Sequence, residues 1–286
     1  MKRKIYLLFI LFTLALNGRP LFSAVFESYG LGARAIGMSS SLVAVGDDYT
    51  SSFFNPAGIA RLQDKTFYSE YRNLYGLGLL RYTAVGYLQP GVGKGTVGFT
   101  WYRLDTVGEA ASIDYAENTL SFSYGISLFS PLYLGVNGKY YRVHSTLGAS
   151  GMGLDFGILY VVDERWLKVG AAVQDLNRTL LSWDSGVKER IPLRLRVGFS
   201  SKPLAHTLVS TQVDWKDQSD QTHRFGLEQE FFEKVIALRV GALERASAIN
   251  FSWGLALRWK GWSFDYGWER ERLLGDTQVF SLSVRY

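Results

Sequence analysis

Apolar and polar residues alternate along most of the chain. From Ile249 to Trp259 every second residue is large and apolar, and the residues between them are mostly small or polar. Because successive side chains of a β-strand point to opposite faces, a period of two predicts a strand with one apolar face. The same alternation recurs in residues 119–128, 191–199, 262–269 and 280–286. The sequence therefore predicts an all-β protein.

These stretches are long. They run for roughly 9 to 12 residues, which exceeds the usual strand of a soluble protein and suits a strand that crosses a membrane at a tilt. Their apolar faces often end in Trp, Tyr or Phe, as in an interfacial aromatic girdle. Their opposite faces hold Gly, Ser, Asn and isolated charges, which suits a confined interior. The pattern favours a transmembrane antiparallel β-barrel over a soluble or secreted sandwich.

The strand count and the joins agree with this fold. Residues 66–286 hold about fourteen candidate strands, as in outer-membrane barrels of even strand number. Twelve is the alternative count, because the first two, near Thr66–Gln89, alternate least regularly. Tight joins such as Lys260-Gly261 alternate with longer loops such as Leu176–Glu189. Short turns at one end and longer loops at the other are typical of outer-membrane barrels.

The polar faces of the expected strands carry charges of both signs. Buried charges are tolerated when they are paired, so we interpret these residues as a paired network that fills the lumen rather than a ladder that selects a substrate. The main members are Lys139, Asp155, Arg194, Arg196, Asp214, Arg239 and Asp265, with Lys168, Arg224, Glu228, Arg258 and Glu269 beside them.

Both ends of the chain carry signals. Residues 1–24 are positively charged at first, then apolar for about a dozen residues, then small, which predicts a cleaved signal peptide. An uncleaved anchor is less favoured because the apolar stretch is short of the roughly 20 residues that a spanning helix needs. At the other end, Phe280 to Tyr286 close an alternating strand, which resembles the terminal aromatic signal that the outer-membrane assembly machinery recognises.

Charge and composition exclude several classes. The formal charge is +5, but four of the 31 basic residues precede the expected cleavage site, which leaves 27 against 26 acidic residues. No basic surplus remains for nucleic acid. The absence of cysteine means that the exported chain folds without disulfides. We expect a location in the outer membrane of a Gram-negative-type bacterium, with membrane lipid as the surrounding partner.

The segment before the barrel does not alternate. Residues 25–65 contain Gly32-Ala33-Arg34-Ala35, a stretch of small residues that ends in Asp47-Asp48, and the sequence Asn55-Pro56-Ala57-Gly58. With these motifs the chain resembles the PorV/PorQ-type outer-membrane proteins, which are related to the FadL fatty-acid transporters. The strand motifs Gly153-Leu154-Asp155-Phe156-Gly157 and Phe264-Asp265-Tyr266 extend the resemblance over nearly the whole expected mature chain.

The resemblance implies that residues 25–65 fold inward as a hatch, and we name them the hatch segment. Pro56 restricts its own backbone and that of Asn55, and Gly58 permits a sharp reversal. An ordinary periplasmic linker is the alternative interpretation. We expect Asn55 to hydrogen-bond to the inner wall. For Asp47 and Asp48 the nearest candidate partners are Arg194, Arg196 and Arg239.

Three functions remain open from the sequence. The first is the binding or passage of small hydrophobic molecules, by analogy with the fatty-acid transporters. The second, implied by the PorV resemblance, is an accessory role in type IX protein secretion, with secreted cargo proteins as partners. The third is a structural barrel without cargo.

Enzyme chemistry has no clear signature. His144, His206 and His223 lack metal-ligand spacing, and the Gly-rich stretch 91–96 lacks two required positions of a phosphate-binding loop. No nucleophile elbow is present, and Asp47-Asp48 is more typical of caps or ion pairs than of an acid–base dyad. We expect no catalytic residues, no metal and no cofactor.

Overall fold

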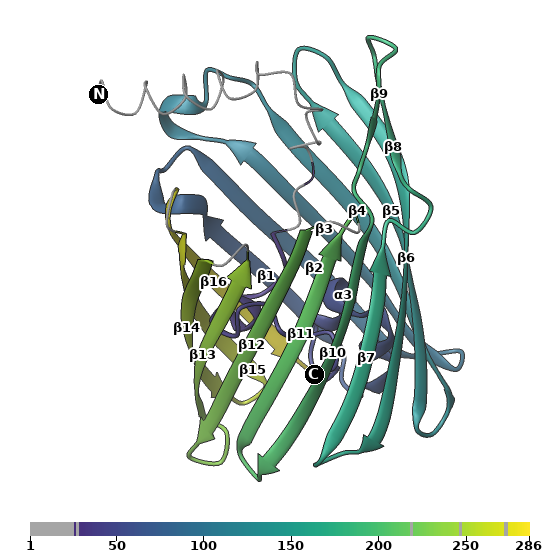
Figure 1. Cartoon of the computed structure of the whole chain (residues 1–286), viewed down its shortest axis with the longest axis vertical. Helices are drawn as coiled ribbons and strands as arrows, with labels where there is room; N and C mark the ends of the chain where they lie inside the picture. The colour runs from purple at the N-terminus through teal and green to yellow at the C-terminus, as the bar shows by residue number, and fades with distance from the viewer. Residues whose placement is uncertain (1–25, 27–28, 218–219, 246–247, 272–273) are drawn as a thin grey trace.

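A barrel of antiparallel strands surrounds a small irregular segment (Figure 1). The computed structural model describes residue 26 and residues 29–217, 220–245, 248–271 and 274–286. The expected signal peptide, residues 1–24, lies outside the described residues. None of the helices in this part of the chain is long and apolar enough to cross a membrane.

Fourteen of the sixteen strands in the described ranges close the barrel. The first strand pairs with the last from Thr66↔Arg285 to Asn73↔Gln278, so the ring has no free edge. The structure thus confirms the all-β barrel and the count of fourteen. The barrel strands are β1 (Thr66–Asn73), β2 (Leu80–Val92), β3 (Gly95–Thr106), β4 (Ala116–Phe129), β5 (Leu132–His144), β6 (Ala149–Asp163), β7 (Leu167–Gln174), β10 (Arg194–Leu204), β11 (Thr207–Lys216), β12 (Asp220–Phe231), β13 (Ile236–Arg245), β14 (Ala248–Trp259), β15 (Trp262–Glu271) and β16 (Gly275–Arg285).

The remaining two strands correct one expectation. The stretch Leu176–Glu189, expected to be a loop, contains β8 (Leu180–Trp183) and the start of β9 (Lys188–Arg190). β8 pairs with both the beginning of β6 and β9, so this hairpin extends the sheet beyond the barrel rim. The physical reason is apolar burial, because Leu181 and Ile191 pack with Val143.

The two faces of each strand differ as the alternation requires. On β14 the six large apolar residues from Ile249 to Trp259 are 42–64% exposed, and Ser252 and Ala256 between them are buried. The outer wall is therefore apolar, which suits contact with lipid tails, and the inner wall is small and polar. Short turns, for example between Trp259 and Trp262, join the strands at the end where the chain terminates, and longer joins lie at the other end.

The hatch segment, over its described residues from Tyr29 onwards, lies inside the barrel, as the purple ribbon shows (Figure 1). It contains two short α-helices, α2 (Ala33–Gly37) and α3 (Ser51–Phe54), and the 3-10 helix η1 (Pro56–Arg61). Two further 3-10 helices, η2 (Leu74–Gly76) and η3 (Gly108–Ala110), lie in joins between strands. Almost all residues from Gly30 to Ile59 are buried. α2 contacts β13 to β16, and η1 contacts β3 to β6.

Candidate functional site

A series of inward-facing glycines brings the hatch segment close to the barrel wall. A Cβ atom added to Gly135 would lie 2.1 Å from the carbonyl carbon of Pro56, and one added to Gly157 would lie 2.1 Å from Oδ1 of Asn55. On the opposite wall, a Cβ atom at Gly241 would lie 2.4 Å from the backbone nitrogen of Ser39. Real Cβ atoms cannot approach so closely, so these positions require glycine for backbone-to-backbone packing.

The Asn55-Pro56-Ala57-Gly58 turn is fixed by hydrogen bonds. The side-chain amide of Asn55 donates to the carbonyl of Val43 (2.8 Å) within the hatch segment and to the carbonyl of Ile158 (2.9 Å) on β6. Its Oδ1 accepts from the backbone N–H of Ala57 at 3.1 Å. Asn55 is buried, and this one side chain therefore links two parts of the hatch segment to the wall.

Asp47 and Asp48 bind a partner that the sequence prediction missed. Both carboxylates lie against Arg34 in the hatch segment itself, at 2.5 Å and 2.8 Å from Nη1. Asp47 also lies 3.9 Å from Nζ of Lys202. The prediction that these aspartates pair with Arg194, Arg196 or Arg239 is wrong, because Arg34 is only 13 and 14 residues away and folds back onto them.

Arg34 also reaches the wall. Its Nη2 lies 2.6 Å from Oε1 of Glu228 on β12. Glu228 accepts in turn from Arg239 at 2.6 Å, and Arg239 binds Asp265 at 2.6 Å. These side chains are nearly fully buried, so the chain of alternating charges is shielded from water and strongly coupled. The Gly-Ala-Arg-Ala motif contained this arginine, but local sequence does not show which strand it reaches.

The seven lumen charges selected from the sequence lie on the inner face in three groups. Arg239 and Asp265 belong to the network of Arg34. Lys139 and Asp155 form an ion pair of 2.7 Å. In the third group, Asp214 lies 3.7 Å from Arg196 and 4.0 Å from Arg194, and Arg224 approaches the same carboxylate at 3.0 Å. The guanidinium of Arg196 lies 5.3 Å from the ring centres of both Phe53 and Phe54 of α3, so this group also contacts the hatch segment.

The end of the hatch segment is tied to the turn between β6 and β7. Nη2 of Arg61 donates to both carboxylate oxygens of Glu164 at 2.7 Å. Burial by itself would raise the pKa of Glu164, but the charges of Arg61 and Lys168 outweigh it and hold the pKa below its ordinary value. Glu164 is largely exposed, so we expect this link to contribute little to stability.

A cavity lies between the hatch segment and strands β2 to β7. Its empty space is about 610 Å³, and part of this space is open to solvent rather than enclosed. On β4 the cavity is lined by Glu117, Thr119 and Ser121, whereas Gly125 further along the strand contacts η1. Because β4 runs from the loop end to the turn end, the cavity lies on the loop side of η1. From the hatch segment, Phe26, Tyr29, Ser52 and Phe53 line it.

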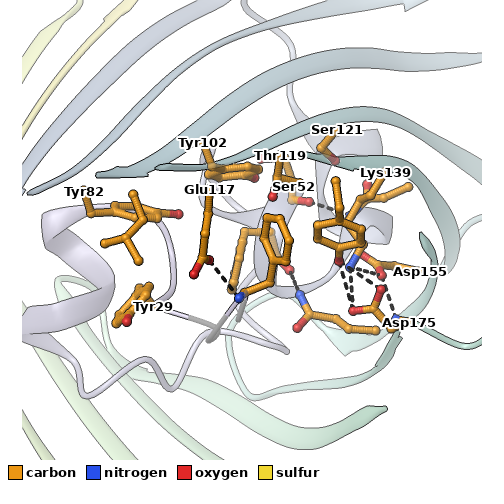
Figure 2. Close-up of a pocket in the computed structure, with 16 residues that line it drawn as sticks. Tyr29, Ser52, Tyr82, Tyr102, Glu117, Thr119, Ser121, Lys139, Asp155 and Asp175 are labelled. Atoms are coloured by element: carbon orange, nitrogen blue, oxygen red, sulfur yellow. Dashed lines mark hydrogen bonds and ion pairs between the residues drawn. The ribbon is translucent and has the colours of Figure 1, made fainter. Parts of the chain in front are cut away.

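The cavity has an aromatic side and a polar side. Figure 2 shows Tyr29, Tyr82 and Tyr102 towards one end and Lys139, Asp155 and Asp175 at the other. Phe53 lies edge-on to Tyr102 with ring centres 5.9 Å apart. The aromatic side offers ring faces and edges to a small apolar molecule. None of these aromatic residues was singled out from the sequence. The available signal was that Tyr82 and Tyr102 are large aromatic residues at inward positions, where the other residues are mostly small or polar.

The polar side is held together by its own hydrogen bonds. Nζ of Lys139 lies 2.7 Å from Asp155 and 2.9 Å from Asp175, and the hydroxyl of Tyr141 donates to Asp175 at 2.9 Å. Asn137 donates to the carbonyl of Ser52 at 2.9 Å, which joins this side to the hatch segment. Oδ1 of Asn137 is buried without a hydrogen-bond partner in the described residues.

Within the described ranges, no three His, Cys, Asp or Glu side chains are grouped to hold a metal ion. His144 lies at the exposed end of β5, 3.5 Å from Asp114. The arrangement of aromatic rings and paired charges is suited to binding a small molecule.

The expected assembly signal forms part of the last strand. Phe280 is 52% exposed on the outer face, and Tyr286 is 66% exposed at the turn end. The backbone of Tyr286 exchanges two hydrogen bonds with Lys65, at 3.0 Å and 3.1 Å, just before β1. The recognition of these residues by the assembly machinery stays a prediction.

No protein-family model matches the chain, and no curated protein matches its sequence. Solved structures do match. The toluene transporter TbuX of Ralstonia pickettii is 12% identical, with 92% of this chain and 100% of that chain covered and a TM-score of 0.69. The toluene transporter TodX of P. putida is 11% identical, with 91% and 99% covered and a TM-score of 0.69. A FadL homologue of Pseudomonas aeruginosa is 12% identical, with 92% and 99% covered and a TM-score of 0.66.

At these identities the likeness concerns the fold. The chain shares the barrel fold of FadL-type transporters, and the narrower resemblance to PorV/PorQ-type proteins has no support among these structures.

Proposed function

We propose that this protein binds small hydrophobic molecules and lets them cross the outer membrane of a Gram-negative-type bacterium. The observation that carries the proposal is the cavity, with an aromatic side and a polar side, between the hatch segment and the wall of a lipid-facing barrel. The shared fold with two toluene transporters and a FadL homologue supports it. The cavity suits a compact molecule, since such sites are concave and mostly apolar with few polar groups.

The hatch segment explains why such a barrel would not leak. A barrel of about fourteen strands is wider than its own wall side chains can fill. Here the hatch segment lies in the lumen and packs on wall glycines, so we infer that it closes the lumen to ions and hydrophilic solutes. In this proposal the cavity receives the ligand from the loop end, and the hatch segment blocks an aqueous path to the turn end.

The test is uptake of radiolabelled toluene and of a labelled long-chain fatty acid by cells that lack their own transporters and carry this protein. Thr119 lines the cavity, and Thr83 faces the outer side on β2. Thr119→Trp should fill the cavity and reduce uptake towards the level of cells without the protein. Thr83→Trp, the same substitution on the outer face, should leave uptake unchanged. Equal uptake by cells with the intact protein, cells with Thr119→Trp and cells without the protein would contradict the proposal.

The accessory role in type IX secretion, expected from the sequence resemblance, has no support in the comparisons or in the cavity. It would gain support if cells without the protein lost surface display of secreted proteins that share a C-terminal domain and showed normal toluene uptake.

A further inference from the structure

The outer wall carries a row of basic side chains where β2, β3 and β5 reach the loop end. On β3 the outward residues Phe99 and Trp101 are followed by Arg103, and on β5 Tyr140 is followed by Arg142. On β2 the corresponding residue is Arg81. The inward neighbours of these arginines, Tyr82, Leu104 and Tyr141, line the cavity. The arginines therefore face away from the lumen, at the border where the apolar wall ends.

The row is ordered by its own contacts. Nη2 of Arg81 lies 2.5 Å from Asp105, and Nε of Arg103 lies 3.5 Å from the same carboxylate. Oδ1 of Asn118 accepts from Nη1 of Arg103 at 3.3 Å and from Nε1 of Trp101 at 3.2 Å. The side chain of Asp105 is 9% exposed, whereas Arg81 and Arg103 are 42% and 35% exposed. The acid is covered and the two cations point outward.

The register of the strands sets the distance between the donor side chains of the row. Arg103 pairs with Asn118, and Asn118 pairs with Arg142 on the next strand. The backbones at Arg103 and Arg142 are therefore two strand spacings, or about 10 Å, apart. Arg142 is exposed and makes no ion pair within the described part of the chain. Within the row the three arginines outnumber Asp105, and the carboxylate of Asp184 lies near Arg142, since Oδ2 of Asp184 and Nη2 of Arg142 are 2.7 Å and 3.5 Å from a Cβ atom added to Gly148. Asn118 can add amide donors between the arginines.

This chemistry fits phosphate groups. An arginine guanidinium can donate two parallel hydrogen bonds to a phosphate. Arg81 already donates from Nε and Nη2 to Asp105, so we assign this two-pronged contact to Arg142. A positive row beside an apolar wall attracts an anionic lipid headgroup. In outer-membrane barrels the end with the longer loops faces the cell exterior, where the leaflet consists of a phosphorylated glycolipid. The exposed Phe99 and Phe122, with ring centres 5.2 Å apart, offer an apolar surface to acyl chains below the row.

We propose that Arg81, Arg103, Asn118 and Arg142 form a binding site for the phosphate groups of one lipopolysaccharide molecule. The site rests on the proposed outer-membrane location and is independent of the proposed transport, because none of its side chains lines the cavity. Its role is to fix the barrel in the outer leaflet on the same wall that carries the cavity behind it.

The experiment is a titration of the purified protein in detergent micelles with bisphosphorylated lipid A, followed by native mass spectrometry. The same titration is made with enzymatically dephosphorylated lipid A and with phosphatidylglycerol. The test variant is Arg103→Gln with Arg142→Gln. The control is Arg270→Gln on β15, which removes an exposed arginine at the same end but outside the row. The shift between unboiled and boiled gel mobility checks that every variant is folded.

We expect lipid A to bind the intact protein and the Arg270→Gln control equally, and to bind the double variant at least about tenfold more weakly, a loss of about 1.4 kcal/mol. Dephosphorylated lipid A and phosphatidylglycerol should bind the intact protein as weakly as lipid A binds the double variant. Equal binding of dephosphorylated lipid A or phosphatidylglycerol, or an equal loss in Arg270→Gln, would overturn the site. Toluene uptake by the double variant should match that of the intact protein. A failure of the transport proposal can therefore be distinguished from a failure of the lipid-binding site.

Discussion

Arg34 and Glu228 form a buried ion pair that joins the hatch segment to the barrel wall. Nη2 of the arginine lies 2.6 Å from Oε1 of the glutamate, and the side chains are 7% and 3% exposed. The same arginine also binds Asp47 and Asp48, and the same glutamate binds Arg239. Removal of Arg34 would therefore leave the buried Asp48 without an ion-pair partner in the described residues, and would leave Glu228 with Arg239, and Asp47 with Lys202, which is more costly than the loss of an exposed pair.

We expect Arg34→Gln to loosen the hatch segment without preventing the barrel from forming. Breaking a buried pair by removing one partner costs about 3–5 kcal/mol, and this cost falls on the hatch segment rather than on the strand ladder. Hydrogen exchange of residues 33–48 should become faster, and exchange of the strands should stay slow. Arg270→Gln, at an exposed site, should change neither. Unchanged exchange in Arg34→Gln would show that the ion pair does not hold the hatch segment in place.

Two glycines on β5 allow the packing of the hatch segment to be tested separately from the stability of the strand. A Cβ atom at Gly135 would meet the backbone of Pro56, whereas one at Gly138 would have no heavy atom within 4 Å. Gly135→Val should therefore displace η1 and cost about 1–3 kcal/mol, as expected for an overpacked site. Gly138→Val should be neutral. Thermal unfolding and hydrogen exchange of residues 55–61 would measure both, and equal behaviour of the two variants would refute close packing at Gly135.

Deletion of Phe280 to Tyr286 should abolish assembly. This stretch forms six of the eight residue pairs between β16 and β1 and five of the ten pairs between β16 and β15, so the truncated ring cannot close. It also contains the expected aromatic signal. The shift between unboiled and boiled mobility in gels, measured on isolated outer membranes, reports the folded barrel. Tyr286→Ala keeps most of the ladder and isolates the contribution of the terminal aromatic side chain. Normal membrane levels of the truncated chain would contradict the prediction.

The barrel could be predicted from the sequence because a membrane imposes a local rule. Outward residues within the lipid-facing band must be apolar, so the period of two along β14 or β16 is visible without knowledge of any partner strand. The hairpin of β8 and β9 was not predicted, because it lies beyond the membrane-facing part of the sheet, where no such rule applies. Its strands depend on burial of Leu181 and Ile191 against distant residues.

The interior could be predicted only in part. The inward glycines indicated a confined lumen, but their individual partners, such as Pro56 opposite Gly135, depend on how the hatch segment folds. The partner of Asp47 and Asp48 was missed because pairing in the lumen depends on three-dimensional proximity and many arginines were available. The cavity was missed since Tyr82 and Tyr102 appear in the sequence as ordinary strand aromatics.

The central claim is that the hatch segment closes a barrel that would otherwise be open. Conductance across a planar lipid bilayer tests it most directly, with the intact protein compared with a variant that lacks residues 30–60. We predict that the intact protein conducts little and that the deletion variant, inserted as a folded barrel, conducts ions steadily. Equal conductance of the two proteins would contradict the claim, because it would show that the hatch segment does not control the path through the lumen.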